Sequence, residues 1–109
     1  MVKGLQFCSF SVKQFSEKIK TNEISPVDLI ECCFDRIRQF NPSLNAFITV
    51  IDERYAYNIA RIAEKDISHG NYRGPLHGIP FSIKDIIYAK GIRCTAGSRI
   101  LSEGRCNMY

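Results

Sequence analysis

Apolar residues recur at helical spacing in three stretches of the first 68 residues. The first stretch begins with the spacing of a capping box, Ser11 to Gln14. Its apolar positions then fall on one face of a helix: Val12, Phe15 and Ile19. We therefore predict a helix over about residues 11–22.

A second helix is predicted over about residues 26–40. Ser25 suits the capping position, Pro26 suits the first helical position, and Asp28 complements the positive end of the helix dipole. The apolar positions form one stripe: Val27, Ile30, Cys33, Phe34, Ile37 and Phe40. The pair Asn41-Pro42 is expected to end this helix.

The segment from Leu44 to Asp52 is apolar and fits either a strand or a lead-in to the next helix. Asp52 is expected to cap a third helix over about residues 52–68, which His69-Gly70 would end. Its inner face is predicted to consist of Tyr55, Ile59, Ile62 and Ala63.

A glycine-rich loop, "GNYRGPLHG", leads into the apolar run "IPFSIKD", which predicts a strand over about residues 79–85. The run is mostly apolar, as expected of a strand that is covered on both faces in a larger sheet. One or two strands do not form a stable sheet alone. Helices followed by such a strand therefore indicate the beginning of a larger α/β domain.

Composition narrows the function classes. The 109 residues carry a net charge of +4, and basic and acidic residues are interleaved, so no basic stripe indicates nucleic-acid binding. No apolar run approaches the roughly 20 residues that span a bilayer, and the N-terminus is a poor signal peptide. Five cysteines without CxxC spacing fit reduced thiols. These features predict a cytoplasmic protein.

Lys84 is the residue of greatest chemical interest, because it lies within the apolar run. On a strand, Ser82 and Lys84 would share one face and Phe81 and Ile83 the other. One interpretation is a lysine at a strand end that reaches water. The other is a desolvated lysine whose lowered pKa lets it act as a base.

The two histidines are weaker candidates than Lys84 for a functional role. His77 has no nucleophile or carboxylate paired with it in the sequence, which favours a loop-packing role, and His69 suits a helix C-terminus. Neither has partners at zinc-ligand spacing, and no phosphate-binding glycine motif is present. The sequence therefore predicts no metal and no cofactor site. "AGS" at residues 96–98 is expected to form a turn.

The segments "GPLHGIPFSIKD" (Gly74–Asp85) and "KGIRCTAGS" (Lys90–Ser98) closely resemble the amidase signature enzymes around their catalytic lysine. The segment Ile24–Val50 is similar to the N-terminal helices of the same enzymes, in the same order. The resemblance spans about residues 10–101. Within that family, residues 98–101, "SRIL", resemble the A subunits of tRNA-dependent amidotransferases.

The resemblance implies an α/β fold with a large mixed sheet flanked by helices, and a Ser–cis-Ser–Lys triad that cleaves amides through an acyl-enzyme. Lys84 matches the lysine. For the A subunits, it implies glutamine hydrolysis that supplies ammonia to partner subunits and, through them, to charged tRNA. It implies no cofactor here, with ATP and magnesium, where used, on a partner subunit.

The sequence also departs from the family pattern. The two serines lie many tens of residues beyond the lysine in the family, "SEGRCNMY" does not continue the pattern, and Ile86 stands where many relatives have asparagine. We therefore expect residues 1–109 to be the N-terminal part of a single amidase domain whose remainder is missing. The alternatives are part of a stand-alone amidase of the same family, or a non-catalytic remnant acting as an interaction module.

We predict that the 109-residue chain alone releases no ammonia from glutamine or simple amides. It carries the expected base, but a lysine alone supplies no acyl-enzyme route. The measurement is ammonia release by the purified chain against a Lys84→Ala control. Release above that control would contradict the prediction.

Overall fold

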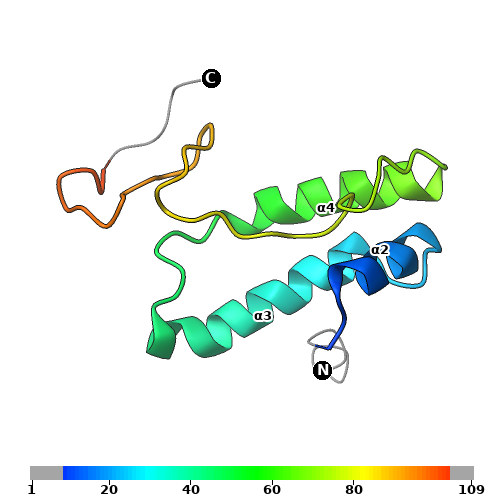
Figure 1. Ribbon diagram of the computed structural model, residues 1–109, viewed down its shortest axis with the longest axis horizontal. Helices are drawn as coiled ribbons and strands as arrows, with labels where there is room; N and C mark the ends of the chain where they lie inside the picture. The colour runs from blue at the N-terminus through cyan, green and yellow to red at the C-terminus, as the bar shows by residue number, and fades with distance from the viewer. Residues whose placement is uncertain (1–8, 104–109) are drawn as a thin grey trace. The chain divides into compact units, whose positions relative to one another are not determined.

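The computed structural model describes residues 9–103 and contains three helices, shown in Figure 1. They are α2 (Val12–Lys20), α3 (Pro26–Leu44) and α4 (Glu53–Ser68). The described chain divides into two compact units. A helical unit consists of residues 9–45 and 52–80, and a loop unit consists of residues 46–51 and 81–103.

Helix α2 begins with the predicted capping box. The backbone N–H of Gln14 donates to the Ser11 hydroxyl at 3.3 Å, and the Gln14 side chain accepts from the Ser11 N–H at 2.8 Å. Two backbone donors that the first turn leaves without helical partners are thereby satisfied. The helix ends at Thr21, whose N–H donates to the Glu17 carbonyl.

Helix α3 begins as predicted but continues further. Ser25 accepts from the Val27 N–H at 2.9 Å, and Pro26 occupies the first turn. The helix runs through Pro42 to Leu44, so the prediction that Asn41-Pro42 ends it is wrong. Proline removes only one N–H, and here it does so in the last turn, where little helix remains to be disrupted. Asn45 ends the helix in the left-handed conformation, with φ 49°.

Helix α4 has the predicted ends but a different buried face. The Asp52 side chain accepts from the Tyr55 N–H at 3.0 Å, and His69 is the C-cap before Gly70. Of the predicted inner face only Ala63 is buried, whereas Tyr55, Ile59 and Ile62 are exposed. The buried residues are Ala56, Ala60, Ala63 and Ile67.

The alanines explain this difference. Two apolar stripes run along α4, one of small residues and one of large ones, and both have helical spacing. Helices α3 and α4 lie side by side and antiparallel (Figure 1). Small side chains let two helix backbones approach closely, so the alanine stripe faces into the helical unit. Phe34 of α3 fills space beside it and stacks on Tyr57, with ring centroids 6.0 Å apart.

A second group of apolar side chains joins all three helices near the α2–α3 turn. Ile19 of α2 is 1% exposed and is the most deeply buried large side chain among the described residues. It packs in one cluster with Ile24, Leu29 and Ile67. Partly buried neighbours complete the cluster: Phe10, Phe15, Tyr72 and Ile79. The loop after α4 is thus part of the core of the helical unit.

The strand predicted over about residues 79–85 is not observed, because residues 9–103 contain no β-strand. A strand is defined by pairing, and a single extended run has no second strand beside it in this part of the chain. The sheet therefore remains a prediction. No helix within the same residues is long and apolar enough to cross a membrane.

We predict that Gly78→Ala destabilises the helical unit more than Gly70→Ala does. Both glycines have positive φ, +82° and +86°, so both alanines bear a similar left-handed strain, about 1–2 kcal/mol. A Cβ at Gly78 would lie 2.7 Å from Cγ of Pro26, whereas one at Gly70 would meet nothing within 4 Å. The overlap should add about 1–3 kcal/mol to the loss.

The measurement is urea unfolding of both variants, followed by circular dichroism at the helical band. Gly70→Ala is the matched control, because it carries the backbone strain without the overlap. Equal losses of stability in the two variants would contradict the packing of Gly78 against the first turn of α3.

Candidate functional site

Lys84 lies in the loop unit, within a segment that carries no regular secondary structure. Its side chain is exposed, as are those of Phe81, Ser82 and Ile83. Its backbone carbonyl accepts from the Ile87 N–H at 2.9 Å, which begins a turn directly after the lysine. The position of Lys84 is therefore set by main-chain contacts that begin at its own carbonyl.

The next residue, Asp85, has the densest set of polar contacts in the loop unit. One carboxylate oxygen, Oδ1, accepts from the Thr95 N–H at 2.9 Å. The other, Oδ2, accepts from the Thr95 hydroxyl and, at 3.4 Å, from the Gly97 N–H. A single side chain thus ties the segment after Lys84 to a second segment ten residues further on.

The main chain of Asp85 reinforces the same connection. Its carbonyl accepts from the Ala96 N–H at 2.9 Å and from the Cys94 thiol at 3.1 Å. Cys94 and Thr95 are 8% and 4% exposed, which makes them the buried residues of this unit. The Thr95 end of the connection is therefore shielded from water, where a hydrogen bond is stronger than it is in full contact with solvent.

The partner segment is a tight turn, as predicted for "AGS". The Ser98 N–H donates to the Thr95 carbonyl at 2.8 Å, and the two central residues, Ala96 and Gly97, have φ of 47° and 71°. Two positive φ values in succession are the pattern of a type I′ turn. The N–H groups of residues 95–97 all donate to Asp85: those of Thr95 and Gly97 to its carboxylate, and that of Ala96 to its carbonyl.

These contacts lower the pKa of Asp85 below its usual value. The main cause is the hydrogen bond from the Thr95 hydroxyl, followed by the one from the Thr95 backbone N–H. Partial burial acts in the opposite direction, and the Gly97 N–H and the positive charge of Arg93 lower the pKa further. All three donors favour the ionised carboxylate, so Asp85 is held as an anion beside Lys84 in the sequence.

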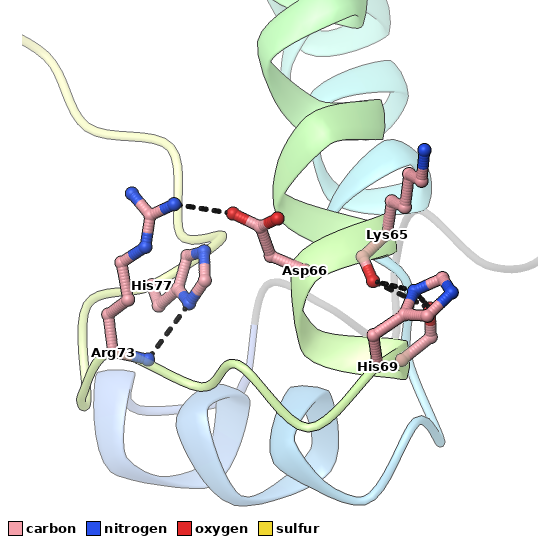
Figure 2. A network of polar contacts seen from close by, with 6 residues as sticks. Lys65, Asp66, His69, Arg73 and His77 are labelled. Carbon is pink, nitrogen blue, oxygen red and sulfur yellow. Dashed lines mark hydrogen bonds and ion pairs between the residues drawn. The ribbon is translucent and has the colours of Figure 1, made fainter.

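His77 belongs to the helical unit and has a packing role. Figure 2 shows its Nδ1 facing the backbone of Arg73, whose N–H donates to it at 3.1 Å. The ring stacks on Tyr72, with centroids 6.2 Å apart, and the Tyr72 hydroxyl is 2.6 Å from the Ser16 Oγ. The Arg73 guanidinium pairs with Asp66 of α4 at 2.5 Å. His77 therefore closes the loop back onto the helices.

His69 is a structural residue as well, as the sequence indicates. Its Nδ1 lies 2.7 Å from the carbonyl oxygen of Lys65, one of the last carbonyls of α4 (Figure 2). The same carbonyl accepts from the His69 backbone N–H at 3.1 Å and from the Ser68 hydroxyl at 2.8 Å, so His69 adds to the capping of the helix end. Within residues 9–103, no group of three or more His, Cys, Asp or Glu side chains is arranged to hold a metal ion. Cys8 and Cys106 lie outside the described residues.

Asp85 was not singled out by the sequence analysis. Two signals were present in the sequence: an acidic residue directly after the candidate base, and a Thr-Ala-Gly-Ser turn ten residues later. Neither signal has a helical or strand period, so only the folded loop shows that the two belong together. Lys84 and Asp85 lie in the loop unit and His77 in the helical unit.

Comparison with known proteins identifies the family. The family model named Amidase matches residues 28–106. The chain is 42% identical over 93 residues to the A subunit of the glutamyl-tRNA(Gln) amidotransferase of Carboxydothermus hydrogenoformans, and 45% identical over 93 residues to that of Methylobacillus flagellatus. Each match covers 85% of this chain and 19% of the relative. No solved structure matches the chain.

The chain therefore belongs to the amidase family, as the resemblance around Lys84 indicates. A further relative, the same amidotransferase component from Geobacter sp. (strain M21), is 38% identical over 91% of this chain and 20% of its own length. The chain thus spans about one fifth of the length of the curated relatives that it matches. The matched residues include Lys84, Asp85 and the turn at residues 95–98.

We predict that the contact between Asp85 and the turn weakens in acid. Because the pKa of Asp85 in the folded loop lies below its usual value of 3.8, the contact stabilises the loop fully above that value. The stabilisation is lost as the pH falls through the lowered pKa. In NMR spectra of the chain, the amide protons of Thr95 and Gly97 should shift together over this acid range and then exchange faster with solvent.

The Asp85→Asn variant is the control, because asparagine does not ionise and its Thr95 and Gly97 amides should not follow this titration. Titration of the two amides in the wild-type chain at or above pH 3.8 would contradict the stabilised carboxylate.

Proposed function

We propose that this chain is the lysine-bearing part of an enzyme that hydrolyses amides, with Lys84 as the catalytic base. The observation that carries the proposal is the family match across residues 28–106. The matched region contains Lys84 and the glycine-containing segments on both sides of it. Because the chain spans about a fifth of its relatives, the activity belongs to a whole protein of which this segment is one part.

The proposed chemistry uses Lys84 as a neutral amine. Lys84 accepts a proton from a bridging serine, which in turn takes the proton of a second serine. The second serine attacks the amide carbonyl, Lys84 returns the proton through the bridging serine to the amide nitrogen, and the carbon–nitrogen bond breaks to release ammonia. Water then hydrolyses the acyl-enzyme and restores the serine. Both serines follow the matched segment in the family pattern, so they are supplied by other parts of the domain.

The amine must lose its proton for this role. A free lysine has a pKa of about 10.4 and is almost wholly protonated at pH 7. Burial lowers a lysine pKa because it disfavours the charged form. Lys84 is exposed within the described chain, so the shielding surface in the proposed enzyme comes from the rest of the domain. A lysine on an exposed segment is accessible to such a surface.

We further propose that the amide is glutamine and that the ammonia passes to a partner subunit that acts on charged tRNA. The support is that the relatives are named as A subunits of glutamyl-tRNA(Gln) amidotransferase. ATP and magnesium would act on the partner subunit, and the assembly would be cytoplasmic. A stand-alone amidase of the same family would instead release ammonia from simple amides without partner subunits.

We predict that Lys84→Arg and Lys84→Ala reduce turnover to a similar extent. A guanidinium keeps the positive charge but is not deprotonated in a protein, so it does not act as a base. Loss of a general base lowers kcat by about 10²- to 10⁴-fold, with little change in KM. The loss can be larger where the base belongs to a catalytic triad whose members act together.

The experiment uses a chimera in which residues 10–101 replace the matching segment of the Carboxydothermus hydrogenoformans relative, assayed with the partner subunits of that relative. Ammonia release is measured with glutamine and with simple amides. Lys90→Arg is the matched control, because Lys90 is another exposed lysine of the loop unit. Lys84→Arg with wild-type turnover, or a folded chimera without activity, would contradict the proposal.

A further inference from the structure

The loop unit fixes the main chain around Lys84 much more firmly than it fixes the lysine side chain. Within residues 9–103, no ion pair or side-chain hydrogen bond to the Lys84 Nζ is formed. The main chain near this side chain is held by two sets of hydrogen bonds. The Lys84 carbonyl accepts from the Ile87 N–H, and Asp85 accepts five hydrogen bonds from residues 94–97. The point from which the lysine side chain extends therefore depends on Asp85.

All five hydrogen bonds between the segment after Lys84 and residues 94–97 are accepted by one residue, Asp85. Asp85 accepts through both carboxylate oxygens and through its carbonyl, and the donors come from four successive residues: Cys94, Thr95, Ala96 and Gly97. Bonding at both the side chain and the carbonyl restricts the backbone dihedral angles of Asp85. Because Lys84 is joined to it by a planar peptide unit, the direction of the Lys84 backbone is restricted too.

Thr95 holds the other side of this arrangement. Its hydroxyl donates to Asp85 Oδ2 and accepts from the Gly97 N–H at 3.2 Å, while its own N–H donates to Oδ1. The N–H groups of the turn are thus directed at Asp85 and do not form an open site for an anionic substrate. Thr95 is 4% exposed, so these bonds are protected from competing water.

We propose that Asp85, held by Thr95, is a positioning residue that fixes the main chain from which Lys84 reaches the reacting serines. The proposal rests on the proposed function, in which Lys84 is the base. A base on a flexible four-carbon stem requires a fixed starting point, because a displacement of about 1 Å at a catalytic group can cost about 10²-fold in rate. Asp85 and Thr95 act through Lys84 and do not contact the substrate.

The test measures ammonia release from glutamine by the chimera described above, with its partner subunits, and expresses kcat per folded protein. Asp85→Asn keeps the shape of the side chain but loses the charge and replaces one acceptor oxygen by a donor group. We expect it to lower kcat by about 10- to 100-fold with KM within about twofold of wild type. Asp66→Asn is the matched control, because it removes a carboxylate that pairs with Arg73 in the helical unit.

Thr95 variants separate the hydroxyl from the shape of the side chain. Thr95→Val loses the hydroxyl and should lower kcat by about tenfold, whereas Thr95→Ser keeps it and should retain most of the wild-type kcat. If the two residues act as a unit, Asp85→Asn combined with Thr95→Val should be little worse than Asp85→Asn alone. If the two substitutions acted independently, their fold-losses in kcat would multiply in the double variant. That result would overturn the coupling between Asp85 and Thr95.

The outcomes distinguish this inference from the proposed function. If Lys84→Arg is inactive while Asp85→Asn and Thr95→Val keep wild-type kcat, the positioning role is wrong and the base assignment stands. If Lys84→Arg is active, the proposed function is wrong and the positioning role falls with it. A lower yield of folded Asp85→Asn chimera with unchanged kcat would show a role in folding alone and would overturn the inference.

Discussion

The helical unit depends on the burial of one small group of apolar side chains. Ile19, Ile24, Leu29 and Ile67 come from α2, the following turn, α3 and α4, and no single helix could bury its apolar face without the others. Burying a large aliphatic side chain contributes about 1.5–3 kcal/mol, so each member of so small a core carries a substantial share of the stability. The loop after α4 joins the same core through Tyr72 and Ile79, which fixes where the chain leaves this unit.

The sequence predicted best what is decided locally. Caps involve residues two or three positions apart, and Ser11, Ser25 and Asp52 all act as predicted. Choices that depend on distant partners were missed. Periodicity could not tell which of the two stripes on α4 faces α3, since that choice depends on how closely the helices approach. The end of α3 was placed too early because proline was judged without regard to how little helix follows it.

The candidate site shows the same division between local and distant information. Lys84 could be singled out from its place in an apolar run and from the resemblance of the neighbouring sequence segments to a known family. The family is confirmed, while the role of Lys84 and the sheet around it remain predictions. The bonds from Asp85 to Thr95 span ten residues of loop, where no repeating pattern relates one end to the other. Such contacts follow from the path of the backbone through space, which a single sequence does not specify.

The connection between Asp85 and Thr95 also has a consequence for the length of the chain between them. The cost of closing a flexible loop grows only as the logarithm of its length, so doubling the loop adds about 0.6 kcal/mol. The interior of this loop includes Gly91, around which there is open space. Related chains could therefore gain or lose residues near Gly91 at little energetic cost. The two closing residues have no such freedom, because a shift of one position would move the carboxylate away from the turn that receives it.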